Sequence, residues 1–359
     1  MYKFEEKVKD VATITIIGAG MMGTALCWPL RDNGQKVRLV GTFLDVDIIN
    51  SLQLTGYHPT LQRQIPEGVQ PYFDNQIEEA LFDADLIVVG VNSLGVDWFA
   101  KTVGPYLHPG SMLIAVTKGL EDLPDGDLQI IPEAIMKRLP PGLQGQVSIN
   151  AIGGPCIAHE LAARRHTGVV FCGQNSADLQ ELRLLFATSY YHIWISTDVI
   201  GVEVCAALKN AYAMGVALAV GMMEQSGLDG LAAMYNPQAA IFAQSCFEMR
   251  RMLQITGGGV DNIGWLPAPG DLFVTVFGGR TLRLGRLLGQ GFSFNEALSQ
   301  LAGVTLESVE IITRIGRALN KLEARGIVQK DEFPLIRHLD NVINTGTKVN
   351  IPWDAFFAR

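Results

Sequence analysis

Short apolar runs separated by helical patterns mark the first half of the chain. The runs are rich in Val and Ile and end in polar residues or glycine, as the buried strands of parallel sheets do. They cover residues 12–18, 36–41, 84–91, 111–117, 147–152 and 167–173. Strands that alternate with helices form βαβ units with parallel strands. We therefore predict a parallel, doubly wound α/β domain over residues 1–197.

The pattern changes after residue 197, where strand-like runs disappear. Apolar residues then recur with helical periodicity over residues 199–224, 236–256, 269–278, 281–289, 293–302, 305–325 and 330–344. We predict an all-α second domain over residues 198–359, in which residues 327–359 carry no motif that indicates a function. The longest apolar stretch, residues 211–223, is too short to span a bilayer and predicts a buried core helix.

Composition narrows the class of protein. The chain has 359 residues, 48% of them hydrophobic and 18% charged, which is typical of a globular protein of two domains. Its net charge of −8, with no offsetting run of Lys and Arg, argues against nucleic-acid and anionic-membrane partners. The charged N-terminus lacks the apolar core of a signal peptide, so we expect a cytoplasmic protein without membrane insertion.

The five cysteines are odd in number and widely spaced. They are Cys27, Cys156, Cys172, Cys205 and Cys246. Because neither a C-x-x-C pair nor a Cys/His cluster occurs, the sequence predicts no disulfide framework and no metal site. Reduced thiols fit a cytoplasmic protein.

A glycine-rich turn follows the first predicted strand. In this turn Gly18 permits a tight reversal, Gly20 allows the backbone to approach a diphosphate, and Gly23 allows the next helix to pack close to the sheet. The helix N-terminus then offers unpaired N–H groups and a partial positive charge to the phosphates. Because a strand precedes the turn and a helix follows it, we favour a Rossmann-type dinucleotide site over a purely structural turn.

The end of the second strand selects between cofactors. NAD-binding folds usually place an acidic residue there, and NADP-binding folds an Arg nearby. The sequence Gly41-Thr42-Phe43-Leu44-Asp45 has neither signature clearly, and the absence of Lys or Arg favours NAD slightly over NADP. Phe43 either stacks on the adenine or packs in the core.

Several segments resemble, in order, the NAD(P)-dependent glycerol-3-phosphate dehydrogenases. Besides the glycine turn these are Thr117-Lys118-Gly119-Leu120-Glu121, Gly154-Pro155 with Ala158 and Glu160, the run 198–210 (DVIGVEVCAALKN), Asn236 with Ala239-Ala240 and Glu248-Met249, Gly270-Asp271-Leu272 with Thr275, and Gly278-Gly279-Arg280. Together they span residues 14–285. The resemblance implies a Rossmann-type domain followed by a helical domain.

Two lysines are the main catalytic candidates. Reduction of a ketone needs a proton donor beside the developing alkoxide, and a Lys in an apolar helix can have a lowered pKa and act as acid and base. Lys209 fits this description, and the resemblance implies the same role; its alternative is a structural ion pair. Lys118 follows a predicted strand at the carboxyl edge, where ligands bind. It either orients the substrate or is an ordinary loop Lys.

Three further residues join this catalytic set. Asp271 and Thr275 are four apart and share one helix face. Asp271 either holds Lys209 or caps its own helix, and the two roles are compatible, while Thr275 is a candidate donor to the substrate. Asn210 is a candidate substrate ligand, with a packing role as the alternative.

The turn at Gly278-Gly279-Arg280 is the candidate phosphate site. A guanidinium binds phosphate in bidentate fashion. The family has Arg-Asn here, whereas this chain has Arg280-Thr281-Leu282. We expect Arg280 and Thr281 to bind the substrate, Thr281 through a hydroxyl with a different reach from Asn, so the substrate is less certain than the reaction class. We interpret Arg283 and the loop residue His58 as solvated side chains. We interpret Cys156 as an inert buried thiol.

The remaining candidate cofactor ligands come from the glycine turn and from the segments compared with the family. They are Met21, Met22, Asn92, Ala158 and Arg280. The predicted function is interconversion of sn-glycerol 3-phosphate and dihydroxyacetone phosphate by a cytoplasmic homodimer. The alternatives are a related dehydrogenase of another small polyol phosphate or hydroxy acid, and a protein that senses NAD(P) without catalysis.

Overall fold

The chain divides into two compact units, each described by itself below. The structure is a computed structural model that describes residues 11–226, 235–301 and 306–358. The first unit, called the sheet unit, comprises residues 1–118 and 132–199; the second, called the helical unit, comprises residues 119–131 and 200–359. A single boundary at residue 197 was predicted, whereas in this division the chain passes from one unit to the other three times.

An eight-stranded sheet forms the centre of the sheet unit. Its strand order is β12-β11-β10-β7-β6-β1-β2-β5. In chain order the strands are β1 (Thr13–Ile17), β2 (Lys36–Val40), β5 (Val69–Tyr72), β6 (Leu86–Val89), β7 (Met112–Ala115), β10 (Ser148–Gly153), β11 (Thr167–Cys172) and β12 (Tyr191–Ser196). The order reverses beside β1, where the glycine turn leaves the sheet, and in open α/β sheets ligands bind at such a switch point.

One pair of strands departs from the predicted parallel sheet. Strands β10 and β11 run antiparallel, with Ile152 opposite Phe171, while the other pairs are parallel. The connection between them contains only the five-residue helix α7 (Ala158–Ala162). A parallel return usually runs back along the sheet through an α-helix. Helix α7 is too short to do so, and the chain enters β11 in the opposite direction.

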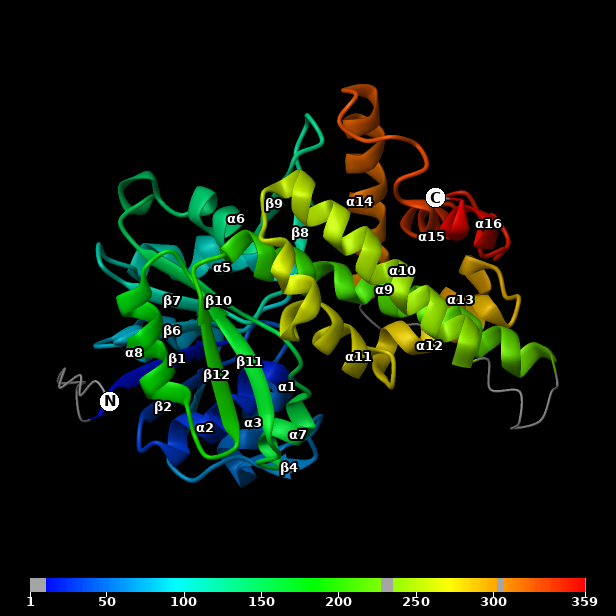
Figure 1. The fold of residues 1–359 in the computed structure, drawn as a ribbon. Coiled ribbons are helices and arrows are strands. Elements are labelled where there is room, and N and C mark those ends of the chain that lie inside the picture. The colour runs from blue at the N-terminus through cyan, green and yellow to red at the C-terminus, as the bar shows by residue number, and fades with distance from the viewer. Residues whose placement is uncertain (1–10, 227–234, 302–305, 359) are drawn as a thin grey trace. The chain divides into compact units, whose positions relative to one another are not determined.

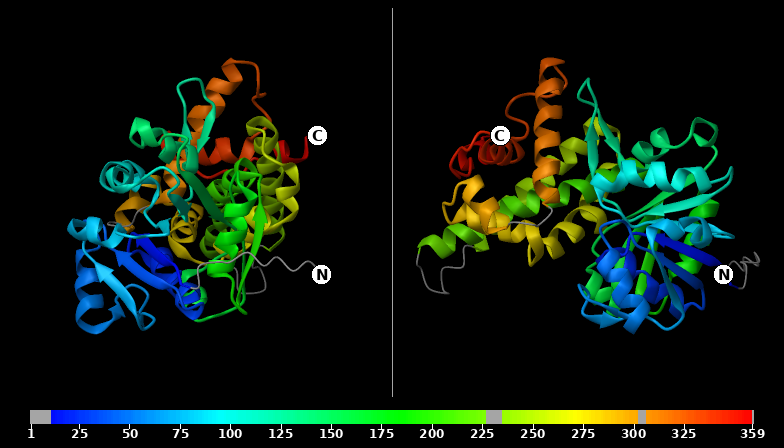
Figure 2. Two further views of the ribbon diagram at one scale, coloured as in Figure 1. Left: turned by 90° about the vertical axis from the view of Figure 1, so that its left-hand side faces the viewer. Right: turned by 180° about the vertical axis from the view of Figure 1, so that it is seen from behind.

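Helices cover both faces of the sheet, as Figures 1 and 2 show. They are α1 (Met21–Ala25), α2 (Cys27–Asp32), α3 (Val46–Thr55), α4 (Ile77–Leu81), α5 (Val96–Val103), α6 (Ile131–Arg138), α7 and α8 (Ser176–Phe186). Successive side chains along β1 point to opposite faces of the sheet, and helices cover each face. Ile14 and Ile16 join the core cluster with α1, α2 and α8, whereas the Thr15 hydroxyl donates to Ala80 O of α4 (2.6 Å).

The helical unit is all-α beyond residue 199 within the described residues. Its helices are α9 (Val199–Ser226), α10 (Tyr235–Thr256), α11 (Asp271–Thr275), α12 (Gly279–Gly289), α13 (Phe294–Gln300), α14 (Glu307–Ala324), α15 (Pro334–Asn344) and α16 (Trp353–Phe357). The predicted helix 293–302 ends, and the predicted helix 305–325 begins, at residues that lie outside the described part of the chain. Helix α9 is long and apolar enough to cross a membrane, but 83% of its most apolar window is buried inside the protein, which is typical of a core helix.

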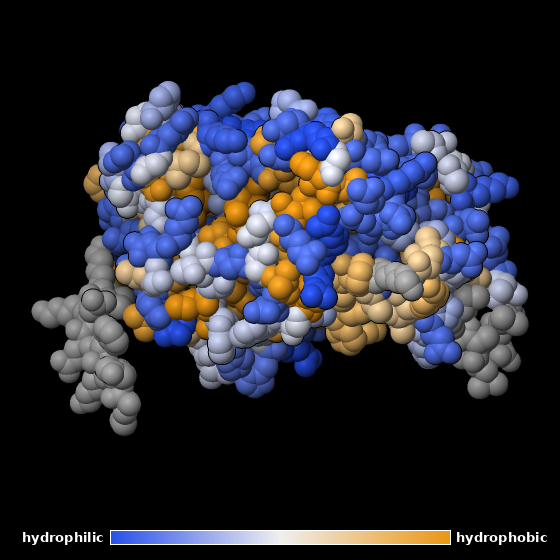
Figure 3. All heavy atoms as spheres, turned by 45° about the horizontal axis from the view of Figure 1, so that its top comes forward, coloured by the Kyte–Doolittle hydropathy of each residue, from blue (hydrophilic) through white to orange (hydrophobic). Residues whose placement is uncertain are grey.

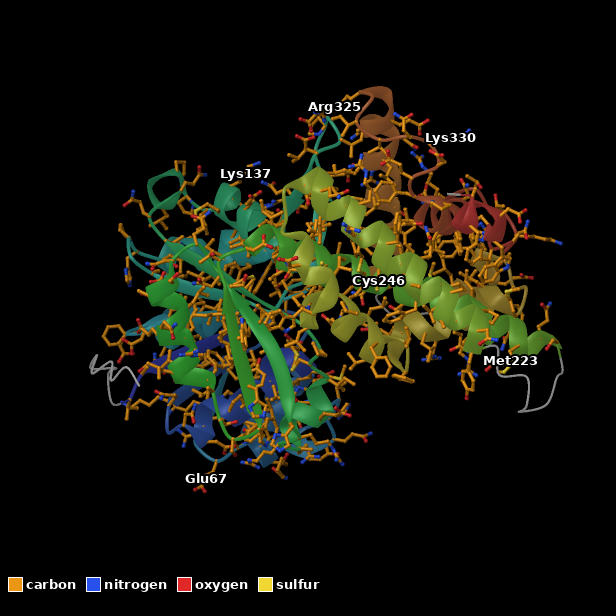
Figure 4. The ribbon with its side chains drawn as sticks, in the orientation of Figure 1. Glu67, Lys137, Met223, Cys246, Arg325 and Lys330 are labelled. Carbon is orange, nitrogen blue, oxygen red and sulfur yellow. The ribbon has the colours of Figure 1, made fainter. Side chains whose placement is uncertain are left out.

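A small hairpin from the first half of the sequence belongs to the helical unit. Strands β8 (Leu120–Asp122) and β9 (Leu128–Ile130) pair antiparallel and pack on α14. Arg317 binds the Asp122 carboxylate through two nitrogens (2.6 and 3.0 Å). Arg325, labelled in Figure 4, donates to the Asp127 carboxylate (2.6 Å). Basic residues along one face of α14 therefore hold the hairpin through its acidic residues.

Candidate active site

The glycine turn has the geometry of a diphosphate cradle. Gly18 has φ +111°, and a Cβ on it would lie 2.7 Å from the Gly90 carbonyl oxygen. A Cβ on Gly23 would lie 2.4 Å from the Gly18 carbonyl oxygen, so helix α1 starts as close to the strand as backbone allows. A Cβ on Gly20, by contrast, would meet nothing within 4 Å. The backbone at Gly20 therefore faces open space, and the unpaired N–H groups at the start of α1 are available to an anion.

Ala19, inside this turn, is held by side chains from outside it. The Asp45 carboxylate accepts from Ala19 N (3.2 Å), and the His58 ring nitrogen Nε2 lies 2.9 Å from Ala19 O. The expectation that His58 is a solvated loop residue is wrong, because its exposed fraction is 0%. Neither contact leaves a local pattern in the sequence, since the partners lie 26 and 39 residues from Ala19.

The other predicted cofactor residues of the sheet unit differ in exposure and in their partners. Phe43 is 58% exposed and its ring centroid lies 6.2 Å from that of Trp98, so it is not a core residue. Asn92 accepts from Gly95 N (3.0 Å) at the start of a 3-10 turn. Met21 is exposed, whereas Met22 and Ala158 pack against the core cluster. Adenine stacking on Phe43 remains a prediction.

Lys118 lies where the sequence placed it, beyond the carboxyl end of β7. Its ammonium donates to the Gly154 carbonyl (3.2 Å), in the turn that follows the neighbouring strand β10. Gly154 has φ +104°, which favours glycine at this bend. The Thr117 hydroxyl donates to Val91 O (2.7 Å) after β6. Side-chain hydrogen bonds thus join three strand ends at the edge where α/β sheets bind ligands.

Lys209 and Asp271 form a buried ion pair inside the helical unit. Lys209 lies on α9 among buried residues and its side chain is 13% exposed, while the Asp271 side chain is fully buried. Gly270, not Asp271, occupies the cap position of α11, so the carboxylate is directed to Lys209 rather than to its own helix start. A buried charge needs a partner, and this pairing holds an ammonium in a mostly apolar place.

The residues around this pair have defined partners. The Thr275 hydroxyl donates to the Asp271 carbonyl (2.6 Å), so its own proton is used within α11. The Asn210 amide donates to the Glu307 carboxylate (3.4 Å) at the start of α14. Lys209, Asp271 and Thr275 are therefore together, as the sequence analysis grouped them, and Asn210 follows Lys209 on α9.

The predicted phosphate turn lies at the start of α12. Gly279 has φ +89°, and the cap position of the helix is Gly278, which has no side chain to accept from the first N–H groups. Arg280 is exposed in the first turn of the helix. Thr281, in contrast, is buried at 8% exposure. Arg280 and the unpaired N–H groups of α12 are thus the accessible anion-binding groups here.

Comparison with known proteins agrees with this arrangement. The NAD-dependent glycerol-3-phosphate dehydrogenase N-terminal family matches residues 13–178, and the corresponding C-terminal family matches residues 198–353. An NADP(+)-dependent glycerol-3-phosphate dehydrogenase of Archaeoglobus fulgidus is 35% identical over 288 residues, 80% of this chain and 83% of that protein. A glycerol-3-phosphate dehydrogenase [NAD(P)+] of Bacillus cereus is 30% identical over 340 residues, 94% and 92% of the two chains.

Solved structures show the same fold. The glycerol-3-phosphate dehydrogenase of Coxiella burnetii superimposes with a TM-score of 0.78 at 25% identity, covering 97% of this chain and 98% of that one. The enzyme from Saccharomyces cerevisiae gives 0.76 at 21% identity, covering 96% and 99% of the chains, which is a likeness of fold alone. The N-terminal family covers the glycine turn, and the C-terminal family that follows it covers the Lys209–Asp271 pair. This chain belongs to the NAD-dependent glycerol-3-phosphate dehydrogenase family of oxidoreductases.

Proposed function

We propose that this protein interconverts sn-glycerol 3-phosphate and dihydroxyacetone phosphate with a nicotinamide dinucleotide. The observation that carries the proposal is the buried Lys209–Asp271 ion pair, in a chain that also has an open glycine cradle for a dinucleotide. A purely structural ion pair would not account for the cradle. Nor would a dinucleotide-binding protein without catalysis need a buried lysine held in this way.

The residues of the turn fit a dinucleotide diphosphate. The space before Gly20 is open, whereas Gly18 and Gly23 have no room for a side chain. A dinucleotide held here would supply the hydride for reduction of the ketone and accept it in oxidation of the alcohol. The absence of Lys or Arg after β2 favours NAD slightly, while the named relatives include an NADP(+)-dependent and an NAD(P)+ enzyme. We therefore propose that both dinucleotides be tested side by side.

The side chains of the helical unit supply proton transfer and anion binding. Lys209 gives a proton to the ketone oxygen in reduction and takes it back in oxidation. Asp271 keeps Lys209 in place and balances its charge. Arg280 and the first N–H groups of α12 bind the phosphate, which offsets the net charge of −8 that would repel an anion.

The test is an absorbance assay of NADH and NADPH oxidation with dihydroxyacetone phosphate. Turnover with either dinucleotide supports the proposal, and the ratio of the two kcat/KM values measures the cofactor preference. Binding of a dinucleotide with no turnover of this ketone would overturn the assigned substrate. We further propose that the protein works as a homodimer in the cytoplasm, which size-exclusion chromatography with light scattering and cell fractionation test.

One observation favours a second candidate, a related dehydrogenase of another small polyol phosphate or hydroxy acid. Thr281 stands where the family has Asn, and its side chain is buried. Arg280 then has one polar neighbour fewer for the phosphate. This candidate predicts that a four- or five-carbon keto-phosphate is reduced with a higher kcat/KM than dihydroxyacetone phosphate.

A further inference from the structure

The glycine turn contains one residue that is not glycine between its first two glycines, and that residue is Ala19. Gly18 has a positive φ of +111°, and Gly20 is extended at φ −66° and ψ 171°. Each of these glycines has more backbone freedom than any other residue type. If the turn moved freely, binding would have to order it at a cost in affinity. The Ala19 peptide groups are the place where such a turn can be fixed.

Both peptide groups of Ala19 are in fact held. Its N–H donates to Asp45 Oδ2 (3.2 Å), and its carbonyl oxygen lies 2.9 Å from His58 Nε2 and accepts from the Thr24 hydroxyl (3.2 Å). The Ala19 methyl group is fully buried. Side chains that follow β2 and α3 therefore reach back to the same residue from its two sides.

The two side chains are themselves fixed in orientation. Asp45 Oδ2 also accepts from the backbone N–H and the hydroxyl of Thr42 (both 2.8 Å). His58 Nδ1 accepts from Leu61 N (3.1 Å), so Nδ1 carries the lone pair and Nε2 carries the hydrogen that it donates to Ala19. The loop at Leu61 thus selects the one tautomer that can hold the turn.

Burial keeps this histidine neutral. Desolvation lowers the pKa of His58, helped by the charge of His159, whereas the Ala19 carbonyl, the backbone of His58 and the nearby Asp45 oppose the shift. A protonated ring would place a second N–H against the Leu61 N–H. The neutral tautomer is therefore the one that matches all of its neighbours.

Asp45 comes soon after β2, where dinucleotide-binding folds often use an acidic residue for the ribose hydroxyl. Here one of its oxygens already accepts three hydrogen bonds from the turn and from Thr42. Through this oxygen the carboxylate holds the turn, whatever its other oxygen binds.

We propose that His58 and Asp45 are positioning residues that hold Ala19, so that the N–H groups at the start of α1 stay directed at the dinucleotide diphosphate. This inference rests on the proposed function, because it assumes a dinucleotide at the turn. It assigns His58 to affinity for the dinucleotide and not to the chemical step.

Two substitutions at one position separate holding the turn from holding the loop. The Asn amide reaches the place of Nδ1, so His58→Asn keeps an acceptor for Leu61 N and loses the donor to Ala19. The Gln amide reaches the place of Nε2, so His58→Gln keeps the donor and loses the acceptor. His108→Asn, at an exposed histidine of the sheet unit, is the matched control.

The experiment is a fluorescence titration of the full-length variants with NADH and with NADPH, alongside thermal unfolding. We expect His58→Asn to raise the Kd for the dinucleotide about fivefold to tenfold, the effect of one buried hydrogen bond. His58→Gln and His108→Asn should stay within about twofold of the wild type, the range left when that bond is kept or never involved. At saturating dinucleotide, kcat and the KM for the ketone should be unchanged in His58→Asn.

Other outcomes overturn the inference. Equal weakening by Asn and Gln would show that His58 supports the loop only, and wild-type affinity in His58→Asn would remove the role altogether. A wild-type protein that binds neither dinucleotide would overturn the proposed function together with this inference. If the wild type binds a dinucleotide but does not reduce the ketone, only the substrate assignment fails, and the comparison of Kd values still decides the role of His58.

Discussion

The two units differ in the polar groups that they bury. Among the described residues, the buried polar side chains of the sheet unit are neutral residues such as Thr15, Thr24 and Asn150, together with His58. The helical unit buries three carboxylates, Glu203, Glu248 and Asp271. Burying a carboxylate is costly unless hydrogen-bond donors or a cation compensate it. Among the described residues, buried carboxylates therefore distinguish the helical unit from the sheet unit.

The difference follows the chemistry of each unit. At the glycine turn the Asp45 carboxylate, which accepts from Ala19 N (3.2 Å), is only partly buried. In the helical unit Asp271 stabilises the ammonium of Lys209, and Glu248 accepts from Tyr212, Gln244 and the backbone N–H groups of Leu335 and Ile336. The two buried carboxylates are therefore compensated in different ways, Asp271 by a cation and Glu248 by four neutral donors. Hydrophobic side chains also reach the surface on the face shown in Figure 3.

The largest test of this comparison is removal of the cation. Lys209→Met should lower kcat by a factor of about 10²–10⁴, the contribution of a positioned acid or base. Affinity for the dinucleotide should be unchanged, because the cradle belongs to the sheet unit. Lys321→Met, at a half-exposed lysine of the same unit, is the control and should keep wild-type kcat.

The same substitution removes the cation that faces the buried Asp271 carboxylate, so the melting temperature should fall as well. Adding Asp271→Asn to Lys209→Met should recover part of that loss without recovering activity. A Lys209→Met enzyme that keeps more than a tenth of the wild-type kcat would contradict the assignment of Lys209.

Two glycines test the sheet unit in the same way. Gly23→Ala places a Cβ 2.4 Å from the Gly18 carbonyl oxygen, so we expect a loss of about 3 kcal/mol in unfolding free energy, typical of overpacking. Gly20→Ala meets nothing in the protein and should unfold like the wild type, yet bind the dinucleotide more weakly. Denaturant unfolding and dinucleotide titration measure the two effects, and parallel behaviour of the two variants would argue against a cradle.

Local pattern was sufficient to predict the glycine turn and the place of Lys209 in an apolar helix, while the catalytic role of Lys209 rests on the resemblance and stays a prediction. The glycine turn lies between a strand and a helix that each have a clear period, and Lys209 interrupts an otherwise apolar helix. Strands β5 and β12 were not predicted, because β5 contains Pro71 and β12 exposes His192 and Trp194 at the sheet edge. Edge strands tolerate proline and polar residues that a search for buried runs rejects.

The contacts that fix the site were beyond reach of the sequence. The Ala19 contacts depend on where the His58 loop returns in space, and the grouping of residues 119–131 with the helical unit depends on α14, which lies far along the chain. Neither leaves a periodic signal. The ion pair of Lys209 with Asp271 was only one of two alternatives until the cap position of α11 was seen to be Gly270.

A smaller effect is expected from the buried carboxylate Glu248. Burial raises the pKa of Glu248 to about 7, although its four hydrogen-bond donors oppose the shift. Its contribution to stability is therefore complete below the ordinary pKa near 4.5 and is lost as the pH rises through about 7. Glu248→Gln should cost about 2 kcal/mol at pH 5, because an amide N–H then meets other donors. The cost should be smaller at pH 8, as urea unfolding at the two pH values would show.

The sheet unit should show the opposite dependence on pH. Because burial lowers the pKa of His58, its contribution is complete above the ordinary histidine pKa of 6.5 and is lost as the pH falls below it. Hydrogen exchange at pH 5 and pH 7 should therefore show lower protection of the amides around Ala19 in acid. His58→Gln should remove that change, and its persistence in the variant would assign it to another group.

The smallest effect is expected where charge is exposed to solvent. Arg317→Ala removes the ion pair between α14 and the β8–β9 hairpin, and the Arg317 side chain is 53% exposed. We expect a loss of less than about 1 kcal/mol, because solvent screens such pairs. A loss several times larger in denaturant unfolding would mean that the hairpin is a structural element of the helical unit and not a peripheral attachment.

The hairpin also bears on how the chain is made. Asp122 and its partner Arg317 are 195 residues apart, so at about 5–20 residues per second the ribosome completes the hairpin roughly 10–40 s before that arginine is synthesised. During this interval the hairpin has no helix to pack on. Its acidic residues, Glu121, Asp122, Asp125 and Asp127, keep the hairpin solvated during this interval. An apolar hairpin of the same length would expose an aggregation-prone segment on every nascent chain.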